Sequence, residues 1–480
     1  MTIRKSAVSG VRWTAISSVC ISVLQYMQVI VLARLLVPQD FGIMAMIMVV
    51  LGFAQAYADM GISKAIIHRQ DTTRLQLSSL YWLNIAAGIL VTGMILAISP
   101  LVAQFYGEPR LEEFMPITAL VFLITPVGQQ FQTLLQKELR FRVLSFIEAG
   151  STALGVIVAV STAFAGAGVY ALIWGQLSTA LAKSVFLAGI GWREWRPAFR
   201  FNRGDLKGYI GFGLYQMGDS SVNYFNSQVD KLLIGRLLGS EVLGYYQLAW
   251  NLIIQPISKI NPILTQVAFP IFAKIQLDNE RLKRGYILLL RLLSFINFPL
   301  LIGMAAVAPL LVPLVFGERW LPSVPLVQVL ALVAVSRAKG NPLGSLQLAK
   351  GRADMAFKWN AMLLLTQLPG VYLGARWGGA VGVAIALLIL QALYSLFGYS
   401  FLLRNLLGPC LKEYLMSMLP ALGCSALMAV TVSFIPQLMK AHSWPILIIQ
   451  VLSGGLLYLA LNLAFQRRQM QEMKSLVIGR

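Results

Sequence analysis

Long apolar runs follow one another along almost the whole chain, and this feature constrains the fold more than any other. A helix crosses a bilayer with ~20 mostly apolar residues, and the runs have this length. They are too long, and alternate too little, for the strands of a membrane barrel. Because 58% of the residues are hydrophobic and only 12% are charged, the chain carries more apolar surface than a soluble protein buries. The sequence therefore predicts an all-α integral membrane protein.

The runs divide the chain into fourteen expected transmembrane helices. The expected spans are residues 12–33, 41–62, 77–105, 112–135, 142–165, 168–192, 208–235, 242–272, 285–316, 321–348, 355–375, 379–403, 413–436 and 444–465. Of the 39 Lys and Arg residues, 27 lie at the two termini or in every second gap, and six lie in the opposite gaps. The positive-inside rule then places both termini in the cytoplasm. This alternation, rather than nucleic-acid binding, accounts for the net charge of +20.

The two halves of the chain resemble each other. Val31–Gly42 reads VLARLLVPQDFG and Leu233–Gly244 reads LIGRLLGSEVLG, so that Arg-Leu-Leu and a later glycine recur at a constant offset. Weaker matches follow in the same order, which indicates a duplication of six spans. Because six is even, both copies have the same orientation, and the repeat is parallel about a pseudo-twofold axis along the membrane normal.

The repeat predicts the domain organisation. We expect two six-helix lobes, a basic and aromatic linker on the cytoplasmic side, and two further helices outside the repeat. The expected boundaries are 1–192 for the first lobe, 193–207 for the linker, 208–405 for the second lobe and 406–480 for the last two helices and the tail. The linker suits an interfacial segment on anionic lipid, or an ordinary basic loop with an aromatic belt.

Charged residues inside the expected spans are the candidate functional residues. A charge facing lipid at a helix centre costs ~2.5–3.5 kcal/mol, so these side chains should face protein or water, or lie near a helix end. The basic ones are Lys183, Lys231, Lys259, Arg291, Arg337 and Lys339. The acidic ones are Asp59, Glu148, Asp219 and Asp230. Lys259, Arg337, Lys339 and Asp219 lie deepest, which favours a cavity over the interface.

Polar residues at helical spacing predict where such a cavity lies. The stripe on the seventh span is Gln216, Asp219, Asn223, Asn226 and Asp230. The next span adds Gln247, Asn251, Gln255 and Ser258. Steps of three and four residues put each stripe on one helix face, which indicates a water-filled lumen. Hydrogen bonds between helices produce the same pattern, so a structural role stays open.

Several segments resemble a known family. They are Phe41–Asp71, Leu80–Asn84, Gln129–Phe141, Phe269–Gln276, Pro313–Trp320 and Gly340–Leu346. These segments are similar to the bacterial polysaccharide transporter family, of the Wzx or colanic-acid type, in the multidrug/oligosaccharidyl-lipid/polysaccharide flippase superfamily. The resemblance implies a bacterial inner-membrane flippase that moves an oligosaccharide repeat unit on undecaprenyl pyrophosphate by alternating access, for exopolysaccharide, capsule or O-antigen synthesis. Implied partners are that lipid-linked oligosaccharide, membrane lipids, a polysaccharide polymerase and a chain-length regulator.

Charge and depth assign roles to the candidates. We expect Lys259, Arg337 and Lys339 to bind the pyrophosphate, with Arg291, Lys183 and Lys231 completing a cationic lumen. Asp219 is the first candidate for coupling to H⁺ or Na⁺, followed by Asp230, Glu148 and Asp59. Three cysteines without metal-ligand spacing and only two histidines predict neither a metal site nor a cofactor.

Three alternatives stay open. A multidrug cation antiporter of the same superfamily would favour an acidic lumen, whereas this one is basic. A lipid II flippase would use similar chemistry, although the sequence resembles that class less. A membrane polysaccharide polymerase or ligase would need a sizeable outer loop and a catalytic constellation, and we find neither in the sequence.

Overall fold

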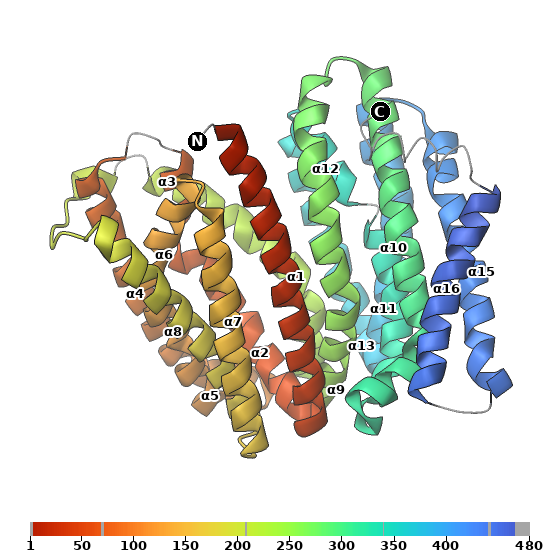
Figure 1. Cartoon of the computed structure of the whole chain (residues 1–480), viewed down its shortest axis with the longest axis horizontal. Helices are drawn as coiled ribbons and strands as arrows, with labels where there is room; N and C mark the ends of the chain where they lie inside the picture. The colour runs from red at the N-terminus through yellow and green to blue at the C-terminus, as the bar shows by residue number, and fades with distance from the viewer. Residues whose placement is uncertain (1–2, 69–71, 207–208, 339, 440–442, 466–480) are drawn as a thin grey trace. The chain divides into compact units, whose positions relative to one another are not determined.

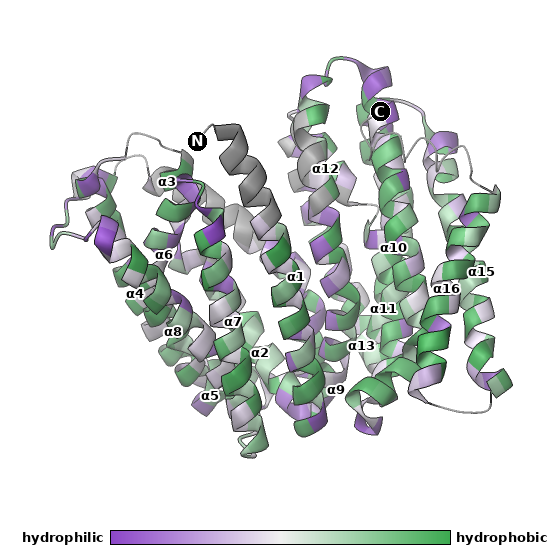
Figure 2. Ribbon diagram, viewed as in Figure 1, coloured by the Kyte–Doolittle hydropathy of each residue, from purple (hydrophilic) through white to green (hydrophobic). Residues whose placement is uncertain are grey.

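The structure is a computed structural model of the chain, and it describes residues 3–68, 72–206, 209–338, 340–439 and 443–465. Within these ranges the regular elements are all helical, with no strand. Eleven stretches of the described chain are long and apolar enough to cross a membrane. Figure 2 shows hydrophobic residues along the length of the helices. The predicted all-α membrane fold is therefore confirmed.

The chain separates into two compact units, residues 1–244 and 245–480, called unit 1 and unit 2 below. The boundary falls inside the long helix α9 (Ile210–Lys274), shortly after Gly239. Gly239 interrupts this helix because its φ of 85° lies in the left-handed region, which glycine adopts readily. The lobe boundaries expected from the repeat remain a prediction.

Unit 1 is a bundle in which α7 packs against both α1 and α8, and α6 packs against α8 (Figure 1). Its helices before α9 are α1 (Ile3–Leu35), α2 (Pro38–Ala58), α3 (Ile62–His68), α4 (Arg74–Tyr106), α5 (Leu111–Ala119), α6 (Val121–Lys137), α7 (Phe141–Phe164), α8 (Val169–Glu194) and the 3-10 turn η1 (Arg203–Leu206). Helix α4 begins at a capping box, in which Thr73 and Gln76 each bond the other's backbone N–H. It ends at Gly107, whose φ is 68°.

Unit 2 is a second bundle, in which α10 packs against α11, α15 and α16. Its elements after α9 are α10 (Asn279–Phe316), η2 (Glu318–Trp320), α11 (Ser323–Ala338), α12 (Asn341–Ala349), α13 (Ala353–Gly398), the π-helical turn η3 (Tyr399–Leu403), α14 (Arg404–Leu407), α15 (Leu411–Met439) and α16 (Trp444–Phe465).

Helices α9 and α13 are each long enough to cross a membrane twice, which affects the number of spans. Helix α9 has 65 residues and α13 has 46, whereas one crossing takes ~20. Each is interrupted once, α9 at Gly239 and α13 at Gly378 and Gly379. These interruptions lie where the sequence separates spans 7 from 8 and 11 from 12. The interruptions agree with fourteen spans arranged as six, six and two. That number and arrangement remain a prediction.

The repeated glycines of the sequence pack reciprocally within unit 1. A Cβ atom on Gly42 would lie 1.6 Å from the carbonyl oxygen of Ser240. A Cβ atom on Gly244 would lie 1.9 Å from the carbonyl oxygen of Pro38. Because Pro38 and Ser240 are themselves equivalent in the repeat, a twofold relation would produce this pair of contacts. Only glycine allows the two backbones to approach so closely.

Candidate functional site

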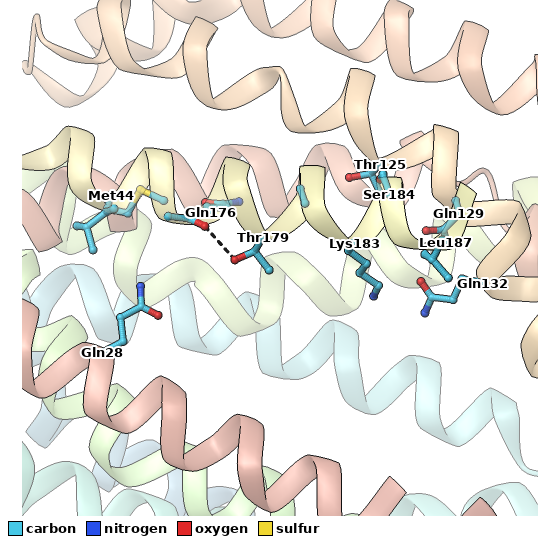
Figure 3. A pocket seen from close by; sticks show the side chains of 13 residues that line it. Gln28, Met44, Thr125, Gln129, Gln132, Gln176, Thr179, Lys183, Ser184 and Leu187 are labelled. Atoms are coloured by element: carbon cyan, nitrogen blue, oxygen red, sulfur yellow. Dashed lines mark hydrogen bonds between the residues drawn. The ribbon is translucent and has the colours of Figure 1, made fainter. Parts of the chain in front are cut away.

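Unit 1 contains a cavity of about 460 Å³ whose wall is rich in amides and hydroxyls. Helices α1, α2, α6 and α8 contribute to it. Its polar lining residues are Gln28, Thr125, Gln129, Gln132, Gln176, Thr179, Lys183 and Ser184. In Figure 3 the side chains of Gln28 and Lys183 point toward the space between α1 and α8.

Helix periodicity places these side chains on common faces. On α8, Gln176, Thr179 and Lys183 follow steps of three and four residues (Figure 3). On α6, Gln129 and Gln132 are three residues apart and Thr125 lies one turn earlier. Each helix therefore presents a polar stripe to the cavity.

Small residues hold α8 close to α7. A Cβ atom on Gly155 of α7 would lie 1.7 Å from the Thr179 hydroxyl oxygen, and one on Gly175 would lie 2.6 Å from Cβ of Ala159. The Thr179 hydroxyl donates to the carbonyl oxygen of Gly175 at 2.9 Å. This close packing fixes the rotation of α8 and with it the face that carries Gln176 and Lys183.

Lys183 supplies the positive charge in the cavity wall. Its ammonium lies 3.6 Å from the carboxylate of Glu148 on α7. The structure thus brings together two candidates that the sequence assigned to different roles, one cationic and one coupling. Because the pair is locally neutral, the cavity offers hydrogen bonds more than net charge. Amides donate and accept at once, which suits ligands rich in hydroxyl groups.

Asp59, another coupling candidate, is linked to this cavity by hydrogen bonds. The Ser63 hydroxyl donates to Oδ1 of Asp59 at 2.5 Å, and Nε2 of Gln129 donates to the Ser63 hydroxyl at 3.2 Å. Gln129 lines both this amide-rich cavity and a smaller one that Asp59 and Asn84 also line. Asp59 caps α2 at a tight corner, where Met60 has a φ of 45°. Two hydrogen bonds therefore link the Asp59 carboxylate to Gln129 in the wall of the amide-rich cavity.

The stripe predicted on the seventh span lies on α9 of unit 1. Asp230 is 1% exposed, and its Oδ1 accepts the backbone N–H of Lys231 at 2.9 Å. Lys231 is buried as well, Asn226 is half-buried and Asn223 is exposed. The side chains of Gln216 and Asp219 lie outside the described residues.

The deep cations of unit 2 differ in their surroundings. The guanidinium of Arg337 on α11 lies over the ring of Trp250, 4.9 Å from its centroid. Lys259 on α9 is exposed and Arg291 on α10 is half-buried. Lys339 lies outside the described residues. Of the predicted stripe on the eighth span, Asn251 accepts from Gln247 at 2.9 Å, and the carbonyl oxygen of Gln255 accepts from Ser258.

Sequence reasoning missed most of the cavity in unit 1. It singled out Lys183 but not Gln28, Gln129, Gln132 or Gln176. The signal that could have found the last three is the same spacing of three and four residues that was applied to the seventh span. Among the described residues, no group of three or more His, Cys, Asp and Glu could hold a metal ion.

Comparison with known proteins places these features in context. The profile of a family described as polysaccharide biosynthesis protein matches residues 31–325. The lipopolysaccharide biosynthesis protein WzxC of Escherichia coli (strain K12) is 35% identical over 418 residues, covering 87% of this chain and 85% of WzxC. The succinoglycan biosynthesis transport protein ExoT of Rhizobium meliloti (strain 1021) is 25% identical over 485 residues, covering 99% of this chain and 96% of ExoT.

A solved structure shares the fold. The lipid II flippase MurJ, in an inward closed conformation, matches with a TM-score of 0.75 at 14% identity. The match covers 96% of this chain and 100% of the MurJ chain.

Proposed function

We propose that this chain, which belongs to the polysaccharide biosynthesis protein family, moves a lipid-linked oligosaccharide across the membrane during polysaccharide synthesis. Its relatives serve polysaccharide biosynthesis, and one is named a transport protein. The chain is a multi-pass membrane transporter rather than an enzyme. The lipid carrier, undecaprenyl pyrophosphate, and the bacterial inner membrane with cytoplasmic termini are parts of the proposal.

The observation that carries the sugar part of the proposal is the amide-rich cavity of unit 1. Sugar hydroxyls both donate and accept hydrogen bonds, and the four glutamines of this wall can do the same. A hydrophilic group inside a membrane protein needs such partners, because leaving a polar group without a hydrogen bond in hydrocarbon costs roughly several kcal/mol of free energy. A volume of about 460 Å³ falls in the usual range of ligand sites.

The pyrophosphate part rests on the cations of unit 2. Lys259, Arg337 and Lys339 would contact the pyrophosphate, with Arg291 adding positive charge to its path. A guanidinium offers a planar fork to phosphate oxygens, which suits Arg337. The ring of Trp250 beneath it would hold the fork flat. The lipid tail stays in the bilayer throughout.

Transport by alternating access needs a source of energy, which we assign to H⁺ or Na⁺. Asp59 and Glu148 are the acids that the structure connects to the cavity wall, one through Ser63 and Gln129, the other through Lys183. Protonating Glu148 would free the Lys183 ammonium to bind substrate. Asp219 and Asp230 on α9 stay candidates for the same task.

The same fold serves other substrates, so the fold does not choose among them. The family and the relatives favour polysaccharide precursors over lipid II or drugs. A polysaccharide polymerase and a chain-length regulator would act on the transported unit and are expected partners.

Export in cells tests the proposal. In a host that lacks its own exporter of this kind, the wild-type chain should restore surface polymer. The double variant Gln132→Ala/Gln176→Ala removes two cavity amides, each worth ~0.5–1.5 kcal/mol, and should lower export roughly tenfold while lipid-linked repeats accumulate inside. The matched control Gln104→Ala/Gln276→Ala changes two exposed glutamines and should export normally. Normal export by the cavity variant would refute the role of the cavity.

A further inference from the structure

A second cavity of unit 1 has a different character from the first. It measures about 500 Å³ and lies between the start of α4 on one side and the last turn of α8 with the segment that follows it on the other. Its lining residues are Arg74, Leu75, Ser78, Trp192, Arg193, Glu194, Trp195, Arg196 and Ala198. Three arginines and two tryptophans thus surround one space.

Hydrogen bonds hold the segment after α8 against α4. The indole Nε1 of Trp82 donates to the carbonyl oxygen of Ala198 at 2.9 Å, and the Ala198 N–H donates to the Ser78 hydroxyl at 3.1 Å. Further along, the Ser79 hydroxyl accepts from the N–H of Asn202 and donates to Asp205. The cavity is therefore preformed rather than enclosed by a loose loop.

The cavity is positively charged. Arg74, Arg193 and Arg196 line it. Glu194 also lines it, but its carboxylate lies 2.5 Å from the guanidinium of Arg140, which is outside the lining. Nε of Arg196 donates to the carbonyl oxygen of Trp192 at 3.3 Å, which orients this arginine. Three arginines therefore line one space, and Glu194, the carboxylate residue in that lining, is already paired with Arg140.

Exposed aromatic side chains lie in and beside the cavity. Trp192 is 51% exposed and Phe199 is 94% exposed. Phe199 stacks on Trp82 with ring centroids 5.1 Å apart, although most of its surface stays open. Exposed aromatic rings beside cations are typical of the zone where headgroups meet acyl chains.

A smaller cavity with both charged and apolar lining residues adjoins the charged one. It has a volume of about 160 Å³ and shares Arg74, Glu194 and Trp195 with it. Leu77, Phe131, Leu134 and Leu135 form the apolar part of its wall, and Glu138 also lines it. A basic cavity with apolar side chains beside it suits a molecule that has an anionic group and hydrocarbon.

From these features we infer that Arg74, Arg193 and Arg196 form a binding site for the phosphodiester headgroup of an anionic phospholipid. The guanidinium groups would bind the phosphate oxygens, Trp192 and Trp195 would cover the glycerol region, and the acyl chains would begin at the leucines of the smaller cavity. The site stands apart from the amide-rich cavity. On the predicted topology it faces the cytoplasmic leaflet, where anionic lipids attract basic segments. It does not depend on which substrate is transported.

Lipid retention tests this site. The full chain is reconstituted in nanodiscs of phosphatidylcholine with a small fraction of phosphatidylglycerol, re-extracted in detergent, and its bound lipids are counted by native mass spectrometry. The wild-type chain should retain phosphatidylglycerol in preference to phosphatidylcholine. The triple variant Arg74→Gln/Arg193→Gln/Arg196→Gln should lose that preference by about tenfold or more, as for lost charge-assisted hydrogen bonds.

A matched control separates the site from general surface charge. Arg200→Gln/Arg281→Gln/Arg284→Gln removes three exposed arginines outside the cavity and should keep the preference. The double variant Arg193→Gln/Arg196→Gln leaves the start of α4 intact and should show the same loss in a folded chain if the triple variant fails to fold. Equal retention by the cavity variants and the wild type, or an equal loss in the control, contradicts the site.

A competition arm distinguishes lipid from other phosphates. Phosphatidylglycerol should stay bound in millimolar inorganic pyrophosphate, because the hydrocarbon part adds to its binding. Displacement of the lipid by pyrophosphate would overturn the inference and assign the cavity to free phosphates or to a diphosphate substrate.

Discussion

Unit 1 and unit 2 both bury polar side chains within apolar helices, but they use them differently. In unit 1, glutamines from three helices surround an open cavity of about 460 Å³. In unit 2, the amide of Asn297 donates to that of Asn261 at 2.8 Å, and the two side chains are 0% and 2% exposed. Gln450 likewise donates to the carbonyl oxygen of Val432 at 3.0 Å. The first arrangement leaves amides facing a space, whereas the second consumes them in helix packing.

The difference teaches that a polar residue in a span is not by itself a site. The same amide group is a binding group where the helices stay apart and a structural group where they meet. In unit 1, α7 approaches α8 closely at Gly155 and Gly175, while Gln176 of α8 lines the cavity. In unit 2, no space separates Asn261 from Asn297. The neighbours of a residue therefore decide between the two roles.

The largest expected effect concerns the cations of unit 2. If they bind substrate, unit 2 contains binding groups as well as structural ones. Lys259→Ala/Arg337→Ala should lower export roughly a hundredfold, because each charge-assisted contact to pyrophosphate is worth ~1.5–3 kcal/mol. The variant should reach the membrane in normal amounts, with lipid-linked repeats accumulating inside. The control Lys274→Ala/Arg284→Ala removes two exposed cations and should export normally. Loss of the folded protein, or normal export, would place these cations in the scaffold.

A smaller effect is expected from filling the cavity of unit 1. Ala180 lies in its wall, and Ala180→Phe should lower export roughly tenfold, because extra bulk against a bound ligand costs ~1–3 kcal/mol. Folding should change little, since the ring has open space to occupy. The control Ala86→Phe adds the same ring at an exposed position of α4. Equal export by both variants would show that the cavity holds no substrate.

The buried amide pair of unit 2 should affect stability and not transport. Asn297→Leu leaves Asn261 without its partner and should lower the free energy of unfolding by ~1–3 kcal/mol. Adding Asn261→Leu should recover much of that loss, because two apolar groups can replace a hydrogen-bonded pair. Thermal unfolding in detergent measures both variants. Export that falls in the double variant despite normal stability would make this pair part of a site.

The smallest effect is a dependence on pH in the turn between α4 and α5. Burial would raise the pKa of Glu108, but hydrogen bonds from Arg110 and Ser240 outweigh it and hold the pKa below 4.5. A lowered pKa stabilises the fold at neutral pH, and this contribution is lost as pH falls through the lowered value. Glu108→Gln should therefore melt earlier than wild type at pH 7 but not at strongly acidic pH.

Glu112→Gln provides the control for this turn, because Glu112 is exposed a few residues away. Its melting temperature should follow the wild type at every pH. A difference between Glu108→Gln and wild type that persists unchanged into strong acid would exclude the carboxylate as its source.

Much of the fold could be predicted from the sequence because span-length apolar runs can only be satisfied as helices in a bilayer. The interruptions at Gly239 and Gly378 also fall in expected gaps. The sequence did not predict how short these interruptions are, one residue in α9 and two residues in α13. The break at Leu120 between α5 and α6 lies within a single expected span.

The candidate site was harder to predict. Lys183 could be predicted as a site residue, because a charged side chain inside a span is costly unless it faces protein or water. Gln132 and Gln176 are neutral and lie in apolar stretches. Their sequence context does not distinguish a glutamine that lines a cavity from one that packs between helices. Only the structure brings them to one cavity. Conversely, nothing local to Asn261 or Asn297 indicates that they pair, since 36 residues separate them.

The central claim is that the amide-rich cavity of unit 1 recognises the sugar of a lipid-linked substrate. Purified chain in proteoliposomes can be supplied with a fluorescent lipid-linked oligosaccharide or with the same lipid pyrophosphate lacking sugar, and the transfer of each between leaflets followed. Gln132→Ala/Gln176→Ala should slow the oligosaccharide substrate roughly tenfold relative to wild type and leave the sugar-free lipid unchanged. Equal slowing of both substrates, or of neither, would contradict the claim.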